Sequence, residues 1–257
     1  MRPVAILRVV TVAAAALVPT VSSGQVDPGN LVVIGAGFVG DWDTEIELAD
    51  SPLPGGTQGS ITKFVVTVQP CVGCGTTFSL PENGAGRWLA SEVLESALQG
   101  PQVLRVATLS EQPLPIARAR IFRRSLPCQS ADLPVLHEST LRGADTGVLV
   151  FPGVRRAADT RTNLILQTVG DPIESADVAI EAFGADGTLL GSMTATVPSE
   201  AAFSALTLVD VVALLGGDAV DGGRIVVTRT SGTALVWGVL ATYAQDGALT
   251  MSGGLNP

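Results

Sequence analysis

The chain of 257 residues has few of the side chains on which catalytic and metal centres depend. It contains one histidine, His137, and three cysteines. A single histidine excludes multi-histidine metal centres, and a Ser-His-Asp triad would have to use His137, which lies in a polar segment. No Gly-x-Ser-x-Gly motif accompanies it. We therefore expect no catalytic residue, no cofactor and no enzymatic activity.

Aromatic and basic side chains are also scarce. Aromatic residues make up 4% of the chain, and Trp42, Trp88, Trp237 and Tyr243 are the ones suited to stacking on sugar rings. Such side chains more often pack in a core or at a sheet edge. The formal net charge is −9, which disfavours nucleic acid or anionic lipid as a partner, because both require a basic surface.

Long apolar runs are absent beyond the first residues. Arg2 and Arg8 give a basic start, Val9 to Val18 is an apolar run broken by Thr11, and small residues follow. This pattern predicts that residues 1–24 are a signal peptide. The run is shorter than the roughly 20 residues that span a bilayer. We expect a secreted, extracellular or cell-surface protein, with the periplasm and an uncleaved N-terminal anchor as alternatives, and no membrane span after cleavage.

The residues that are abundant favour β-structure. Val, Thr, Ala and Gly dominate, and short apolar alternations are separated by Gly and Pro. Segments of the two halves also match in a fixed order at an almost constant spacing. Thr44 to Leu48 matches Thr162 to Leu166, and Thr77 to Pro81 matches Thr194 to Pro198. Later segments of the two halves match in the same order. The fixed order indicates an internal duplication.

This pattern predicts an all-β protein with two tandem antiparallel β-sandwich domains of the immunoglobulin-like type, each with one short helix. The first domain is expected over residues 28–127 and the second over 147–250, with a linker at 128–146. Ala185-Asp186-Gly187 is a hairpin signal. Ser91 and Thr207 are positioned to cap the helices, with Asp210 completing a capping box after Thr207.

Two short motifs resemble those of secreted bacterial tandem β-sandwich repeat proteins of unassigned function. Phe151-Pro152-Gly153-Val154 stands in the second copy, where the first has Ile34-Gly35-Ala36-Gly37. A Trp-x-Thr-x-x-x-Leu motif runs from Trp42 to Leu48 in the first copy, and the second copy lacks its Trp. The resemblance implies a surface or extracellular module and supplies no catalytic residues.

Cys71 and Cys74 form the most visible cysteine motif. A redox pair would need a helix start, and a zinc site would need a second ligand pair. A strand-like segment follows instead, and Cys128 and His137 are the remaining candidates for ligands. We predict a Cys71–Cys74 disulfide at a hairpin tip in an oxidising compartment. A bridge to Cys128 is the alternative.

Acidic residues give weak calcium candidates. Asp41 and Asp43 lie in an acidic run, and Asp218 and Asp221 lie in a glycine-rich loop. Carboxylate oxygens suit calcium. A solvated acidic face explains the run equally simply, and no metal site is predicted.

The two copies differ in charge at aligned strand positions. Glu45 and Glu47 in the first copy correspond to Asn163 and Ile165, and Arg118 and Arg120 correspond to Val239 and Ala241. If the charged strands are neighbours, their side chains pair across the sheet. In the second copy, Ile165, Trp237, Val239 and Tyr243 share one strand face and form a candidate contact face. The alternative is a shifted register that makes this face the core of its own domain.

Two functions fit these observations. The first is a non-catalytic structural or adhesive module that is secreted or displayed at the cell surface. The alternative is a carbohydrate- or peptide-binding protein that uses an aromatic or apolar face of a sandwich. Two adjacent, exposed aromatic rings would favour the alternative, whereas buried and scattered rings would favour the structural module.

Overall fold

The computed structural model describes eleven stretches of the chain, which together carry the sheets discussed below. They are residues 31–37, 40–49, 63–68, 76–79, 85–93, 102–108, 116–137, 145–169, 174–199, 205–244 and 248–255. The predicted signal peptide at residues 1–24 and the predicted Cys71–Cys74 disulfide lie outside these residues.

The N-terminal part, residues 31–137, contains two antiparallel sheets. Sheet A has the order β4-β3-β6-β1-β9, and sheet B has the order β5-β2-β7-β8. The elements are β1 (Leu31–Ala36), β2 (Trp42–Ala49), β3 (Lys63–Val68), β4 (Thr76–Ser79), β5 (Ala85–Leu89), α1 (Ala90–Val93), β6 (Gln102–Thr108), β7 (Ile116–Arg123), β8 (Leu126–Leu133) and β9 (Val135–His137).

The C-terminal part, residues 145–255, also contains two antiparallel sheets. Sheet C has the order β10-β15-β12-β13, and sheet D has the order β14-β11-β16-β17. The elements are β10 (Val148–Arg156), β11 (Thr160–Val169), β12 (Ala176–Phe183), β13 (Leu189–Val197), β14 (Leu206–Leu208), α3 (Val211–Leu214), β15 (Val220–Ser231), β16 (Leu235–Ala244) and β17 (Leu249–Gly253).

The all-β sandwich class predicted from the sequence is confirmed. Strand pairs are antiparallel throughout the described residues, as alternating strands joined by short turns favour. The predicted turn at Ala185-Asp186-Gly187 joins β12 to β13, with Gly187 at φ 84°. Only short helices occur among the described residues, and each spans four residues.

The predicted linker at 128–146 is wrong over its first part. Residues 126–133 form β8 at the edge of sheet B, and residues 135–137 form β9, which pairs with β1 in sheet A. Pro134 marks the point where the chain changes sheets. Strand β8 is an edge strand of sheet B and lies beside β17. An edge strand tolerates Pro127 and needs few apolar residues, so its sequence resembles a linker.

The predicted capping box in the second copy is also wrong. Thr207 lies in β14, where it is opposite Ile165 of β11. Asp210 occupies the N-cap position of α3 with φ 48°, a left-handed backbone conformation that Asp tolerates better than most residues. Its backbone N–H donates to Asn163 Oδ1 at 3.0 Å, and its carboxylate accepts from Arg156 Nε. The side chain of Asn163 in β11 therefore holds the N-terminus of α3 in place.

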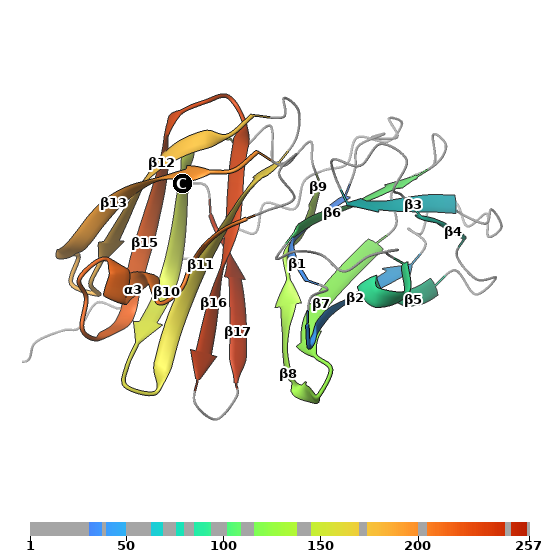
Figure 1. Ribbon diagram of the computed structural model, residues 1–257, viewed down its shortest axis with the longest axis horizontal. Helices are drawn as coiled ribbons and strands as arrows, with labels where there is room; N and C mark the ends of the chain where they lie inside the picture. Colours follow the sequence, from blue (N-terminus) through green and yellow to red (C-terminus); the bar gives the residue numbers. More distant parts are fainter. Residues whose placement is uncertain are drawn as a thin grey trace, which may run out of the picture.

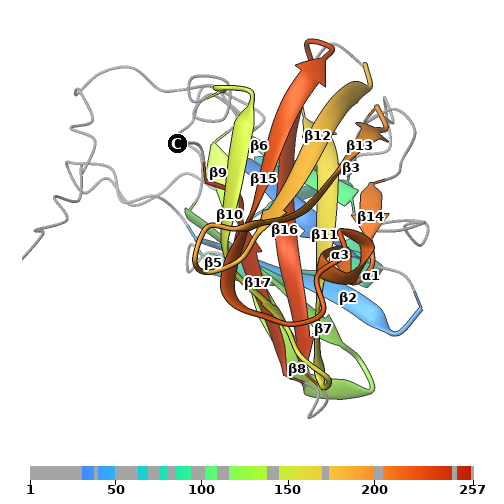
Figure 2. The same ribbon diagram turned by 90° about the vertical axis from the view of Figure 1, so that its left-hand side faces the viewer.

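The four sheets are arranged as two pairs. In Figure 1, sheets C and D are layered on the left, and the N-terminal part lies on the right with β1, β8 and β9 towards β16 and β17. Figure 2 looks onto sheet C, with β10, β15, β12 and β13 in front. Sheet D therefore lies between sheet C and the N-terminal part.

Buried apolar side chains form two clusters of different composition. One cluster lies between sheets C and D and is built from residues of the C-terminal part alone, including Phe151, Leu164 and Ile180. The other contains the N-terminal core together with side chains from sheet D. Five of its eighteen buried members come from the C-terminal part, namely Ile165, Val169, Val239, Ala241 and Leu249. The N-terminal core is therefore completed by sheet D.

Candidate functional site

The outer face of sheet D is the strongest candidate site, because it is an apolar sheet face outside its own sandwich. In β11 and β16, Leu164 and Leu240 point into the cluster between sheets C and D. Successive side chains alternate between sheet faces. Ile165 and Val239, which are opposite each other in the register, therefore point outward. They are nevertheless 5% and 0% exposed, because the N-terminal part covers them.

The register of β11 and β16 thus excludes the alternative of a shifted register, in which this face would be the core of its own domain. Ile165, Val239 and Ala241 belong to the cluster that contains β1 of the N-terminal part. Trp237 is half-buried and packs against both clusters, and Tyr243 is half-buried at the edge of the shared one. We call the surface formed by Ile165, Trp237, Val239, Ala241 and Tyr243 the sheet D face.

Gly35 in β1 lies directly against the sheet D face. Its backbone N–H donates to Gln167 Oε1 at 3.0 Å, across 132 residues of sequence. Gln167 is 3% exposed. Gly35 has φ 79°, and a Cβ at this position would lie 3.1 Å from Cγ2 of Val239. A glycine therefore permits both the backbone conformation and the close contact between the two parts.

Aromatic side chains lie at the edge of the same interface. The rings of Trp42 in β2 and Tyr243 in β16 meet edge to face, with centroids 6.4 Å apart and an angle of 78°. The guanidinium of Arg161 lies 5.3 Å from the Tyr243 ring centroid. Edge-to-face packing and the cation over the ring are favourable contacts, and they leave no flat pair of exposed rings here.

Burial against Trp42 and its neighbours raises the pKa of Tyr243, and the nearby Arg161 partly opposes that rise. Tyr243 is the one tyrosine in the chain, so an absorbance titration of phenolate formation reports on this contact alone. We expect a midpoint above 10.0 in the native protein and a return towards 10.0 in denaturant. Because the pKa of Tyr243 is raised in the folded state, the contact contributes its whole share of the unfolding free energy below pH 10. That contribution is lost as the pH rises through the native pKa.

The control for that titration is Trp42→Ala, which removes the ring that covers Tyr243. The midpoint should move down towards the unfolded value while the chain stays folded, since Trp42 is itself only partly buried. An unchanged midpoint in this variant would mean that Trp42 does not shield the phenol.

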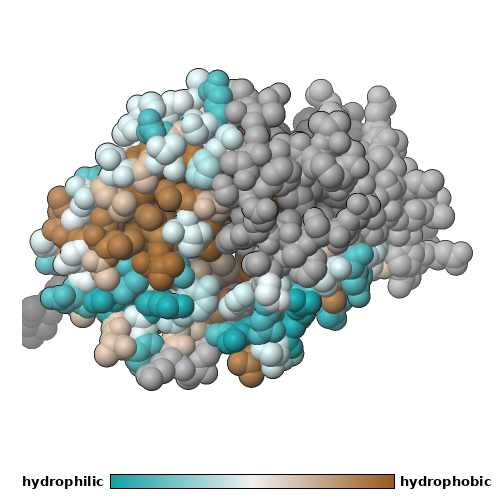
Figure 3. All heavy atoms as spheres, viewed as in Figure 1, coloured by the Kyte–Doolittle hydropathy of each residue, from teal (hydrophilic) through white to brown (hydrophobic). Residues whose placement is uncertain are grey.

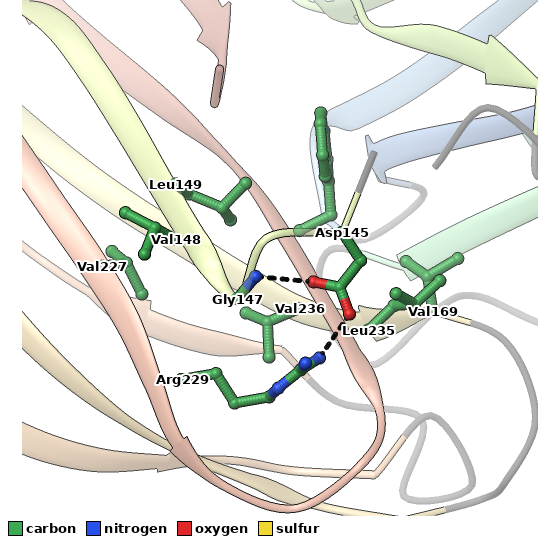
Figure 4. A pocket seen from close by; sticks show the side chains of 10 residues that line it. Asp145, Gly147, Val148, Leu149, Val169, Val227, Arg229, Leu235 and Val236 are labelled. Atoms are coloured by element: carbon green, nitrogen blue, oxygen red, sulfur yellow. Dashed lines mark hydrogen bonds and ion pairs between the residues drawn. The ribbon is translucent and has the colours of Figure 1, made fainter. Parts of the chain in front are cut away.

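A small pocket lies beside the start of β10, lined by residues of β10, β11, β15 and β16 (Figure 4). At its mouth Asp145 Oδ2 accepts from Arg229 at 2.8 Å, and Asp145 Oδ1 accepts from the Gly147 N–H at 2.9 Å. Arg229 also donates to the Ala234 carbonyl. Trp237 lines the pocket, and its Nε1 is buried with no hydrogen-bond partner among the described residues. The ion pair holds the entry to β10 against the β15–β16 hairpin.

The outer face of sheet B is charged, whereas the sheet D face is apolar. Glu45 is opposite Arg120 and Glu47 is opposite Arg118 in the register of β2 and β7. The expected Glu45–Arg120 pair is confirmed at 3.2 Å, and Glu45 also contacts Arg87. Arg118 pairs with Asp132 of β8 rather than with Glu47. Only 4% of the Glu45 side chain is exposed, so the two arginines neutralise a carboxylate that is largely removed from water.

The first calcium candidates serve as acceptors within the fold. Asp43 is fully buried, and its carboxylate accepts from the backbone N–H of Ser91 at 3.1 Å and from the Ser91 hydroxyl at 2.5 Å. It therefore holds the start of α1 against β2. Asp41 accepts from Ser125 and from Arg123, and the hydroxyl of Ser125 is the main cause that lowers the pKa of Asp41.

The second pair of calcium candidates is separated between strand and loop. Asp221 pairs with Arg155 at 3.0 Å on the surface, and the backbone carbonyl of Asp218 accepts from Arg156. No group of three or more His, Cys, Asp or Glu side chains suited to a metal is found in the part of the chain that the structure describes.

The remaining residues singled out in the sequence are scattered. Cys128 is exposed on β8 and carries a free thiol, and His137 is exposed at the end of β9. Trp88 is half-buried in β5 and packs on the shared cluster. The structure adds Gln167 and the Asp145–Arg229 pair, which the sequence analysis missed. The available signal for Gln167 was its position as a polar residue directly after the apolar residues Leu164, Ile165 and Leu166.

Comparison with known proteins adds no identification. No protein-family model matches the chain, and no curated protein matches it. Among the described residues, no helix has the length and apolar character needed to cross a membrane.

Proposed function

We propose that the protein is a non-catalytic structural module, secreted or displayed at the cell surface, whose two parts act as one rigid body. The observation that carries this proposal is the use of the sheet D face. The apolar side chains best suited to binding a ligand are covered by the N-terminal part, and Val239 is fully buried there. A surface committed to internal packing supports a structural role over ligand binding.

The two parts are, on this proposal, tandem copies of one sandwich. Strands β1 to β8 and β10 to β17 have the same order in their sheets. The Thr44 hydroxyl donates to the Gly37 carbonyl, and the Thr162 hydroxyl donates to the Arg155 carbonyl, each seven residues upstream. Gly35 and Gly153 both adopt a positive φ at matching places in β1 and β10. Matched details of this kind support duplication more strongly than strand order alone.

The alternative of a carbohydrate-binding protein receives less support. Trp42 and Tyr243 meet edge to face, and Arg161 lies over Tyr243, whereas a sugar platform needs an accessible ring face. An experiment on glycan arrays separates the two functions. The purified chain lacking residues 1–24 should show no saturable glycan binding. Saturable binding that Trp42→Ala abolishes would overturn the structural proposal in favour of the alternative.

The proposed location has its own test. Protein recovered from the medium or the cell surface should begin after Ser23 or Gly24 when its N-terminus is sequenced. Recovery of the chain from the cytoplasm with residues 1–24 retained would contradict secretion.

A further inference from the structure

Strand β13 differs from the other sheet edges in the described part of the chain. A free edge offers unpaired backbone groups to another strand, and proteins protect such edges with short strands, charges, prolines or covering elements. Here β4, β5, β9 and β14 have five residues or fewer. Strand β8 carries Pro127 and Asp132 and lies beside β17. Strand β10 carries Pro152 and pairs with Leu255 through Val150.

Strand β13 is neither short nor charged and contains no proline, although the end of α3 packs on its start. It runs for nine residues with the sequence LLGSMTATV, without a charge or a proline. From Gly191 to Val197 its pairing with β12 is free of bulges. In Figure 2, β13 forms the outer strand of sheet C. The corresponding edge strand of the N-terminal part, β4, has four residues. A long, uncharged edge of this kind is suited to receiving another strand.

We propose that β13 pairs antiparallel with β13 of a second copy of this chain, about a two-fold axis at Thr194, so that two copies of sheet C become one continuous sheet. Contact about such an axis is isologous, so the strand must complement itself. Pairing centred on Thr194 places Ser192 opposite Thr196 of the partner subunit, and Met193 opposite the partner's Ala195. Hydroxyl side chains then meet hydroxyl side chains on the outer face, and apolar side chains meet on the inner face.

The burial pattern of β13 agrees with this pairing. Ser192, Thr194 and Thr196 are exposed, and the residues between them are half-buried towards the sandwich. Cross-strand Thr and Ser pairs are favourable, and β13 itself carries no charge. The Thr196 hydroxyl donates to Asp177 of β12 at 2.7 Å, so that carboxylate keeps its partner on the outer face. Apolar side chains also gather over α3 (Figure 3), where Val209 and Leu214 are half exposed. The end of α3 packs on the start of β13, because a Cβ on Gly191 would meet the Leu215 carbonyl. The apolar surface is thus continuous with the free edge.

The test compares two lysine substitutions by sedimentation velocity over a range of protein concentrations. Thr194→Lys places like charges opposite each other at the two-fold axis, and it should weaken dimerisation by about tenfold or more. Thr230→Lys puts the same charge on the exposed end of β15, away from the edge, and should leave the dimer unchanged. A wild-type chain that stays monomeric at every concentration overturns the proposal, as does a dimer that Thr194→Lys leaves intact.

Cysteine cross-linking tests the position of the axis. In a Cys128→Ser background, Thr194→Cys should form a disulfide-linked dimer under mild oxidation, because residue 194 faces its own copy. Thr196→Cys should not, because its opposite position is the partner's Ser192. Cross-linking through Thr196→Cys instead of Thr194→Cys would overturn the pairing about Thr194.

Discussion

Val239→Arg is expected to separate the two parts of the molecule. Val239 is fully buried in the shared cluster and lies against Gly35. An arginine there brings a charge into an apolar contact, and the sheet D face contains no acidic side chain to pair with it. A buried charge without a partner costs about 3–5 kcal/mol. We expect urea to unfold the unsubstituted protein in one transition and the variant in two. In the variant, the N-terminal part should unfold at a lower urea concentration than the C-terminal part.

The C-terminal part should keep its own structure in this variant, because its core between sheets C and D contains no residue from the N-terminal part among the described residues. Val209→Arg is the matched control, since Val209 is 51% exposed. It should change the unfolding free energy by less than about 0.5 kcal/mol. If Val239→Arg unfolds both parts together at one lowered midpoint, the C-terminal core is not independent.

Gly35→Ala is expected to have the second largest effect, and Gly153→Ala is its matched control. Both glycines have a positive φ, at 79° and 73°, so each alanine bears a backbone cost of about 1–2 kcal/mol. A Cβ at 153 meets nothing within 4 Å, whereas a Cβ at 35 would lie 3.1 Å from Val239 Cγ2. Overpacking adds about 1–3 kcal/mol at position 35. Chemical denaturation of the two variants should show this difference.

A double mutant isolates the contact itself. Val239→Ala removes the methyl groups that a Cβ at position 35 would meet, so the cost of Gly35→Ala should fall towards that of Gly153→Ala in the Val239→Ala background. Equal costs for Gly35→Ala in both backgrounds would show that the contact between β1 and the sheet D face contributes nothing to the effect.

Much of the strand layout was predictable because alternation on a half-buried strand is visible in the sequence. The alternation of Glu45, Ile46 and Glu47 indicates one polar and one apolar side, and the register of β2 and β7 follows it. The all-β class follows from the same periodicity. Strand β1 was harder to interpret, because its sequence is a continuous apolar run without alternation. Leu31, Val32 and Val33 are all buried, because both faces of β1 are covered.

The site was less predictable, because a single sequence does not state what covers an apolar face. Ile165 and Val239 were recognisable as an apolar strand face, but a core and an interface bury the same residue types. The role of Gly35 depends on a contact with Val239, which is distant in the chain, and no local pattern exists for it. The largely polar sequence of β8 and the proline that follows it resemble a linker, because an edge strand needs few apolar residues.

The most direct test of the account is a comparison of the separated parts by ¹H–¹⁵N correlation spectra. The central claim is that sheet D completes the N-terminal core. Residues 145–257 alone should give dispersed signals, whereas residues 25–144 alone should give the narrow dispersion of an unfolded or molten chain. Adding the unlabelled C-terminal part should then restore native signals in the labelled N-terminal part. An N-terminal part whose spectrum alone already matches that in the whole chain would contradict the claim.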